Sequence, residues 1–297
     1  MTGFLGIDIG GTKVALRAEH EGSEPYQTSF LWPRTPGGPD WSADLEALAA
    51  QVAALRRDWP LPIGSVGVAV PATLDAAGRV VAWPNRPSWA GRDLGLALRG
   101  LFADASVRWA DDGDLAALAE AGAAGCADVV YVGVGTGIGG GVLVDGRPLP
   151  GLGHGSCELG HLVIDRSGPR CDCGRDGCVQ AVASGPATLR RAARLRGAEV
   201  SYAELAAGFG ARDPWALDAV RESCAAVAAA VVGVSELLSL PLALVGGGFA
   251  HGVPGFAAEV DRAARRLARP GRRIAVRRAA LDGLSSLHGA ILLARGI

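Results

Sequence analysis

The sequence contains very little of several residue types, and each shortage narrows what the chain can do. Lysine occurs once, as Lys13, methionine occurs once, and aromatic residues make up 5% of the 297 positions. The 29 basic and 30 acidic side chains give a formal net charge of −1. Because nucleic-acid-binding proteins carry a strong positive field, we expect no nucleic-acid partner.

The chain also lacks a long apolar segment. Every stretch of about 18 residues contains charged residues or small residues that interrupt an apolar run, so we predict no membrane-spanning helix. Residues 1–3 lead directly into FLGIDIGG, without the basic and apolar regions of a signal peptide. We therefore expect a cytoplasmic protein, and 297 residues are enough for one large domain or for two lobes with their own cores.

Glycine is abundant, with 44 residues, and many of them lie in turns that follow apolar strands. Three such turns occur, in IDIGGTK (7–13), GVGTGIGGG (133–141) and VGGG (245–248). Glycines let backbone N–H groups approach a phosphate closely. A single glycine turn is explained equally well by a hairpin, but three of them, two with a threonine, favour phosphate binding.

Two common nucleotide-binding folds are nevertheless excluded. GTGIGG at 135–140 matches G-x-G-x-x-G, but the strand-like VLVDG follows it where a dinucleotide-binding fold requires a helix. A hydride-transferring dehydrogenase is therefore disfavoured. No G-x-x-x-x-G-K-[ST] motif occurs, which excludes a P-loop enzyme. Strand–turn–strand units followed by alternating helices and strands instead predict an α/β protein with two similar lobes. One helix is expected over 40–59, with Ser42 as its N-cap.

A cluster of cysteines indicates a metal site. His161, Cys171, Cys173 and Cys178 form H-x9-C-x-C-x4-C, and three thiolates with one imidazole suit a closed, structural zinc site. Buried free thiols are the alternative, but core packing alone does not explain C-x-C-G-x-x-G-C.

With its flanking motifs, this cluster makes the chain similar to the ROK family of repressors and sugar kinases over nearly its whole length. The matching segments are D-x-G-G-T at 8–12, an N-D-x-N-like stretch at 111–114, the motif around Glu158 and His161, the cysteine cluster and V-G-G-G at 245–248. The first motif begins by Gly6, which leaves no room for the helix-turn-helix of the repressors. A kinase is therefore expected.

The resemblance implies an actin-like (ribonuclease H-like) ATPase fold of two lobes with a cleft. The expected small lobe is 1–112, with a C-terminal helix at about 284–297 packing back on it, and the large lobe is 113–283 with the zinc loop. The implied cofactors are ATP, Mg²⁺ and structural Zn²⁺, although polyphosphate stays open as the donor. Asp8 would hold Mg²⁺ through water. The expected phosphate and nucleotide contacts are Gly10, Gly11, Thr12, Lys13, Gly135, Thr136, Gly137, Gly246 and Gly247.

WADDGD at 109–114 follows an apolar run and precedes a helix-like run. In the family this segment reads N-D-A-N, and its Asp, here Asp112, is the general base that accepts the proton of the attacking hydroxyl. The alternative is that these acids only cap the helix, which we expect of one of them.

Two sugar-site positions depart from the family pattern. Asp111 replaces an Asn that binds hydroxyls around C3 and C4, and Gln180 replaces a Glu. An ionised Asp only accepts hydrogen bonds and binds an ammonium group more strongly than a hydroxyl. We therefore hypothesise an aminohexose, with 3-amino-3-deoxyglucose (kanosamine), used by antibiotic-pathway members of the family, as the best fit. The other expected sugar contacts are Asn85, Glu158 and His161.

The function expected from the sequence is thus ATP-dependent phosphorylation of the 6-hydroxyl of a glucose-like sugar, with an aminohexose favoured. A plain glucokinase is the first alternative, and a sugar sensor without catalysis is the second. The retained Asp8, Thr12, Asp112 and Thr136 argue against the sensor. The resemblance implies a homodimer.

Overall fold

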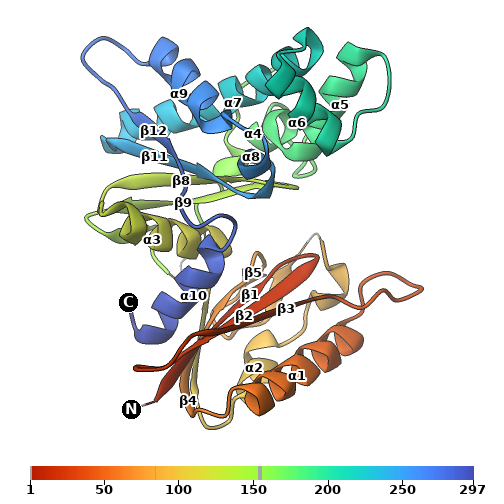
Figure 1. Ribbon diagram of the computed structural model, residues 1–297, viewed down its shortest axis with the longest axis vertical. Coiled ribbons are helices and arrows are strands. Elements are labelled where there is room, and N and C mark those ends of the chain that lie inside the picture. The colour runs from red at the N-terminus through yellow and green to blue at the C-terminus, as the bar shows by residue number, and fades with distance from the viewer. Residues whose placement is uncertain (1, 84, 153–155) are drawn as a thin grey trace. The chain divides into compact units, whose positions relative to one another are not determined.

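The computed structural model describes residues 2–83, 85–152 and 156–297, so that Met1, Pro84 and residues 153–155, among them His154, lie outside the description. The chain forms two compact units (Figure 1). Unit 1 comprises Met1–Ala119, Pro150–Gly155 and Ser286–Ile297, and unit 2 comprises Glu120–Leu149 and Ser156–Ser285.

Unit 1 is built on a five-stranded sheet with the order β3-β2-β1-β4-β7. β1 pairs antiparallel with β2 and parallel with β4, so its backbone is hydrogen-bonded along both edges and it is a central strand of the sheet. The elements are β1 (Gly3–Ile9), β2 (Lys13–Glu19), β3 (Tyr26–Leu31), α1 (Trp41–Asp58), β4 (Ile63–Ala69), β5 (Thr73–Leu74), β6 (Val80–Ala82), η1 (Pro87–Trp89), α2 (Leu94–Leu101), β7 (Ser106–Ala110) and α3 (Asp112–Ala124), which continues into unit 2.

The C-terminal helix α10 (Ser285–Arg295) packs on the β1–β4 pair of unit 1. A Cβ atom at Gly67 would collide with the carbonyl oxygen of Ala290, and one at Gly6 would lie 2.9 Å from Cγ1 of Ile291. The Ser65 hydroxyl donates to the carbonyl of Ala294 over 2.7 Å. The two glycines therefore let the helix backbone lie directly against the sheet.

The start of α1 differs from the sequence prediction. The helix begins at Trp41, and the Asp40 side chain accepts a hydrogen bond from the N–H of Ala43 over 2.9 Å. Asp40 is therefore the N-cap, and the prediction of Ser42 was wrong. Both residues are good caps, and Asp40 takes the role because its backbone is extended whereas Ser42 already lies inside the helix.

Unit 2 repeats the same sheet plan with the order β10-β9-β8-β11-β12. β8 and β9 form an antiparallel hairpin, and β11 lies parallel to both β8 and β12. The elements are β8 (Val129–Val134), β9 (Ile138–Val144), β10 (Arg147–Leu149), η2 (Leu159–His161), α4 (Val179–Ala183), α5 (Gly185–Arg196), α6 (Tyr202–Ala211), α7 (Pro214–Leu238), β11 (Leu242–Gly246), α8 (Gly248–Gly252), α9 (Phe256–Leu267) and β12 (Ala275–Arg278).

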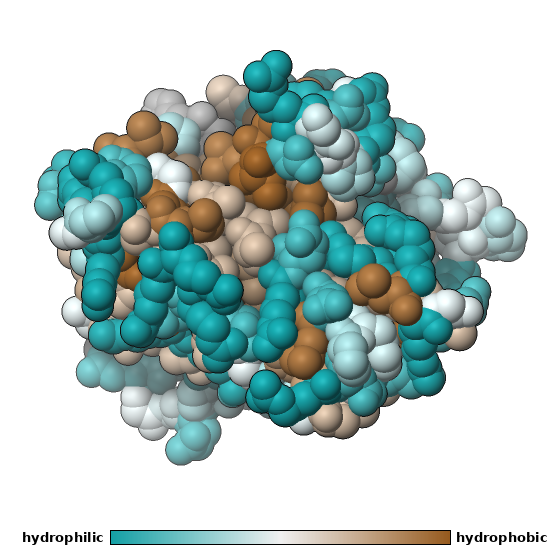
Figure 2. Space-filling model, turned by 90° about the horizontal axis from the view of Figure 1, so that it is seen from above, coloured by the Kyte–Doolittle hydropathy of each residue, from teal (hydrophilic) through white to brown (hydrophobic). Residues whose placement is uncertain are grey.

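Two sheets of three antiparallel and two added parallel strands give the duplicated α/β plan of actin-like ATPases. Each unit has its own core, with Leu5, Ile7 and Val68 in unit 1 and Val130, Val132 and Val227 in unit 2. The apolar residues that stay visible on the face drawn in Figure 2 lie among hydrophilic ones. Among the residues that the structure describes, no helix is both long and apolar enough to cross a bilayer.

Candidate active site

The first glycine turn, between β1 and β2, is held from behind through its carbonyl groups. The N–H of Gly10 donates to the carbonyl of Lys13 over 3.0 Å and closes the turn. The indole N–H of Trp32 donates to the carbonyl of Gly10 over 2.7 Å, and Nε of Arg86 donates to that of Gly11 over 3.2 Å. The turn carries Thr12, whose side chain is exposed. A turn fixed in this way can present backbone N–H groups to a phosphate without reorganising.

Arg86 owes its position to a buried ion pair. It donates to the Asp44 carboxylate, and both side chains are buried, at 5% and 1% exposure. The guanidinium lies 4.5 Å from the ring centre of Trp32, and the indole N–H of Trp89 donates to Asp44 over 2.8 Å. The sequence did not predict this cluster of Arg86, Asp44, Trp32 and Trp89. Its only signal there was the loop at 83–93, which is rich in proline and tryptophan. Trp83 and Trp89 are buried, so they pack the loop.

Asp8 and Asp112 form the acidic centre of unit 1. Burial raises the pKa of Asp8 to about 6, against the opposing effect of Lys13. Burial also raises the pKa of Asp112 to about 7, and the nearby Asp8 charge raises it further. The negative charges of both carboxylates are thus poorly compensated by nearby cations, so the pair is suited to binding a cation. The raised pKa also suits Asp112 to act as a base near neutral pH.

Asp111 is the acid that caps α3. Its Oδ1 accepts hydrogen bonds from the N–H groups of Gly113 and Asp114, over 2.9 and 3.3 Å. Both bonds stabilise the ionised carboxylate.

Asn85, another predicted sugar contact, is exposed. Its side chain lies beside Gly11, and a Cβ added to Gly11 would lie 3.1 Å from it. The structure therefore places Asn85 next to the first glycine turn.

The second glycine turn, between β8 and β9, is held by residues that follow the cysteine cluster. The N–H of Gly135 donates to the carbonyl of Gly137, and the N–H of Gly185 donates to the carbonyl of Gly135, both over 2.9 Å. Oε1 of Gln180 accepts from the N–H of Ile138 over 3.0 Å. Thr136 is exposed at the tip. Gln180, which was predicted to contact the sugar, contacts the second glycine turn in this structure.

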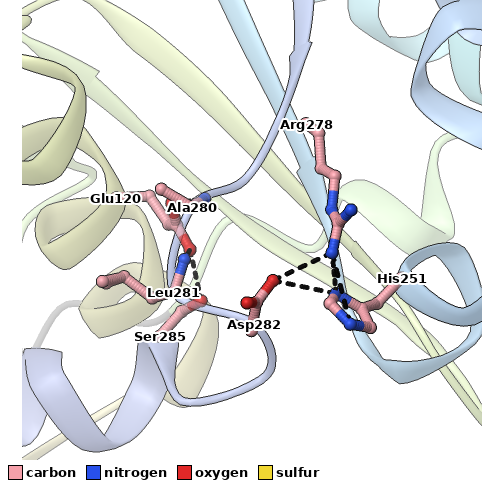
Figure 3. A network of polar contacts seen from close by, with 7 residues as sticks. All are labelled: Glu120, His251, Arg278, Ala280, Leu281, Asp282 and Ser285. Carbon is pink, nitrogen blue, oxygen red and sulfur yellow. Dashed lines mark hydrogen bonds and ion pairs between the residues drawn. The ribbon is translucent and has the colours of Figure 1, made fainter.

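The third glycine turn follows β11, and close contacts explain its glycines. A Cβ at Gly246 would lie 2.8 Å from that of Ala279, and Gly247 has φ +87° with the backbone of Val134 directly beside it. A small pocket over this turn is lined also by His251, Arg278 and Asp282. The Asp282 carboxylate lies 3.0 Å from Nη2 of Arg278 and 3.1 Å from Nδ1 of His251 (Figure 3).

The loop after β12 is anchored by Glu120, which is buried at 1% exposure. Its carboxylate accepts hydrogen bonds from the N–H groups of Ala280 and Leu281 and from the Ser285 hydroxyl, over 2.7, 3.1 and 2.6 Å (Figure 3). These bonds fix the loop that carries Asp282 at the edge of the pocket. No sequence motif indicates this anchor, because Glu120 and its partners lie about 160 positions apart.

The four predicted zinc ligands come together in unit 2. One ligand atom each from His161, Cys171, Cys173 and Cys178 lies within 4.8 Å of the others. Nδ1 of His161 is 3.7 Å from Sγ of Cys171, and Sγ of Cys173 is 3.6 Å from that of Cys178. Ligands of a tetrahedral site with metal–sulfur bonds of about 2.3 Å lie roughly 3.8 Å apart, so the set fits Zn²⁺.

The chemistry of the buried thiol supports the same conclusion. Burial raises the pKa of Cys178 to about 12, whereas the backbone N–H and side chain of Arg175 lower the pKa of Cys173 to about 6. A buried thiolate at Cys178 requires a compensating cation, which a bound metal would supply.

Glu158, a predicted sugar contact, lies just before η2. Its side chain is exposed and accepts a hydrogen bond from the Ser156 hydroxyl over 2.9 Å.

Comparison with known proteins identifies the family. The model of the ROK family matches residues 4–297. Kanosamine kinase of Amycolatopsis mediterranei (strain S699) is 52% identical over 291 residues, which cover 98% of this chain and 95% of that protein.

Solved structures agree with this result. The ROK hexokinase from Thermus thermophilus has a TM-score of 0.84 at 31% identity, over 99% of this chain and 98% of that one. The ROK family glucokinase from Streptomyces griseus, in complex with glucose and AMPPNP, has a TM-score of 0.81 at 26% identity, over 99% and 100%. The predicted actin-like α/β fold is confirmed. The chain belongs to the ROK family.

Proposed function

We propose that the chain is an ATP-dependent sugar kinase that transfers the γ-phosphoryl group to the 6-hydroxyl of an aminohexose, with kanosamine as its substrate. The observation that carries the proposal is the pair Asp8 and Asp112, whose pKa values are raised to about 6 and about 7 beside a preformed phosphate turn. The 52% identical kanosamine kinase supports the choice of sugar.

In this reaction Asp112 is the general base. Its pKa of about 7 means that it is largely ionised at slightly alkaline pH and still basic enough to accept the proton of the attacking hydroxyl. Because phosphoryl transfer needs little covalent assistance, the remaining residues act by positioning and by electrostatics. The turns at Gly10–Lys13 and Gly135–Gly137 would supply backbone N–H groups and the Thr12 and Thr136 hydroxyls to the phosphates.

The cofactors of this proposal are ATP and Mg²⁺. Asp8 would hold Mg²⁺, through water, which fits a carboxylate whose pKa is raised by burial and whose negative charge raises that of Asp112. When bound, Mg²⁺ would neutralise charge that develops on the transferring phosphoryl group. Gly246 and Gly247 would back the adenosine, beside the pocket edged by His251, Arg278 and Asp282.

Sugar recognition is assigned to the residues that the sequence motifs indicate. Asn85, Glu158 and His161 would contact hydroxyls, and the zinc site would orient the His161 ring through Nδ1, the nitrogen that faces Cys171. Asp111 would receive the ammonium group of the aminohexose. Oδ1 of Asp111 already accepts from two backbone N–H groups, which fixes the carboxylate in place, and a carboxylate binds an ammonium group more strongly than a hydroxyl.

The test is a coupled ATPase assay with kanosamine, glucose, glucosamine and N-acetylmannosamine, with product identified by phosphorus NMR. We expect the highest kcat/KM for kanosamine and a 6-phosphate product. A preference for glucose would make the chain a plain glucokinase, and no turnover by the metal-loaded protein would favour the sensor. We further expect a cytoplasmic homodimer, which sedimentation and cell fractionation would test.

A further inference from the structure

The phosphate hairpin of unit 2 is held by residues that are direct neighbours of zinc ligands. Gln180, two positions after Cys178, accepts the N–H of Ile138 over 3.0 Å. On the other side, Gly160, next to His161, packs so closely that a Cβ there would collide with the carbonyl of Ile138. The backbone of Ile138 is therefore held by a hydrogen bond at its N–H and by close packing against its carbonyl.

The two gripping segments are also tied to each other. The N–H of Val179 donates to the carbonyl of Leu162 and the N–H of Ile164 to that of Gly177, both over 2.9 Å. The segment that carries His161 and the segment that carries the cysteines thus form one small module. The first segment carries His161 and the second carries the three cysteines, and each contacts the hairpin through a residue within two positions of one of these predicted ligands.

Packing strengthens this attachment. The side chain of Leu159 lies against Gly140, where an added Cβ would be 2.6 Å from its Cδ1. Gly137 faces Gln180, and a Cβ there would lie 2.8 Å from Oε1. Leu159, Ile138 and Val179 are buried in the same core. The hairpin therefore has no room to shift toward the module, and the hydrogen bond from Ile138 prevents a shift away from it.

We propose that Gln180 and Gly160 are positioning residues through which the His161–Cys171–Cys173–Cys178 site fixes the phosphate hairpin at residues 135–138. The metal site then serves nucleotide binding in addition to any role toward the sugar. The assignment of the hairpin to ATP phosphates rests on the proposed function, whereas the mechanical link between module and hairpin does not.

The test compares three variants of the full chain. Gln180→Ala removes the acceptor for the Ile138 N–H, and Gln180→Glu keeps one, because a carboxylate oxygen can take the same bond. Gln27→Ala is the control, since Gln27 is an exposed glutamine in β3 that accepts from Arg17 over 3.2 Å. Zinc content is measured for each variant by elemental analysis, and hydrogen exchange is measured by mass spectrometry.

We expect Gln180→Ala to keep its zinc and to raise the KM for ATP roughly fivefold, the effect of one lost neutral hydrogen bond, with less change in the KM for sugar. Deuterium uptake by peptides covering 133–141 should rise in this variant and in wild-type protein treated with a chelator. Peptides covering β1 should not change. Gln180→Glu should keep hairpin exchange at the wild-type level, because its carboxylate still accepts from the Ile138 N–H. Gln27→Ala should behave as the wild type in both the ATP KM and hairpin exchange.

Two results would overturn the inference. One is hairpin exchange that stays unchanged in both Gln180→Ala and chelated protein. The other is a rise in the KM for sugar alone, which would make Gln180 only a sugar ligand. If no sugar is phosphorylated but hairpin exchange still rises in Gln180→Ala, the proposed function fails while the link between the metal module and the hairpin stands.

Discussion

Replacing the proposed base by its uncharged analogue should cost activity and stabilise the fold. Burial and the Asp8 charge raise the pKa of Asp112 from 3.8 to about 7. The folded protein therefore holds a proton that the unfolded chain releases, so stability is greatest below the unfolded pKa and falls as pH rises toward 7. Above pH 7 the wild type carries the full cost of an ionised Asp112, which Asp112→Asn avoids.

The size of this effect follows from the pKa shift. Three pKa units correspond to an upper limit of about 4 kcal/mol, at about 1.4 kcal/mol each. Because Asp112 is only partly shielded from solvent, we halve this figure and expect the variant to gain about 2 kcal/mol at pH 8 and clearly less at pH 5. Loss of a general base lowers kcat by roughly 10²- to 10⁴-fold.

Urea unfolding followed by tryptophan fluorescence is a suitable assay, since six of the seven tryptophans lie in unit 1 with Asp112. The measurements are made without Mg²⁺ and ATP, which would compensate the charge. Asp104→Asn, at an exposed acid of the same unit, is the control and should show no pH-dependent gain. An Asp112→Asn variant that is stabilised equally at pH 5 and pH 8, or destabilised at pH 8, would refute the reasoning.

Three further predictions follow from the same unit. In the wild type, kcat/KM should rise with pH through about 7 and then level off, because Asp112 must be ionised; a profile flat from pH 5 to 9 would contradict its role as base. Asp111→Asn should lower the preference for kanosamine over glucose roughly tenfold in a competition assay, and an unchanged ratio would remove Asp111 as the ammonium partner. Arg86→Met should destabilise unit 1 by about 3–5 kcal/mol in urea unfolding, because it leaves Asp44 buried without its cation; the double variant with Asp44→Asn should recover part of that loss.

Residues close in sequence were the predictable part of the site. The glycine turns and the zinc ligands occur within short motifs whose spacing already carries the chemistry, and the structure forms both. Arg86 and Asp44 could not be paired from sequence, because they lie 42 positions apart and Arg86 follows no periodic pattern. The bond from Ile138 to Gln180 was missed for the same reason, since nothing local indicates which backbone N–H a glutamine will meet.

Helix ends show the limit of local rules. Asp40 and Ser42 both suit an N-cap, and the choice depends on where the chain leaves the preceding loop, which sequence does not specify. The roles assigned to the site residues stay predictions, whereas the fold and the family are confirmed.

The position of α10 bears on how the protein is synthesised. Unit 1 combines residues that precede unit 2 in the sequence, Met1–Ala119, with residues that follow it, Ser286–Ile297. While the ribosome is still making unit 2, the first sheet has emerged, but Gly6 and Gly67 have no helix against them. Domains fold as units during synthesis, and unit 1 lacks α10 until Ser286–Ile297 has been made, so unit 2 should be complete first and unit 1 should close only after that segment has emerged. A stalled chain of about 280 residues would then expose this glycine-faced strand pair to chaperones.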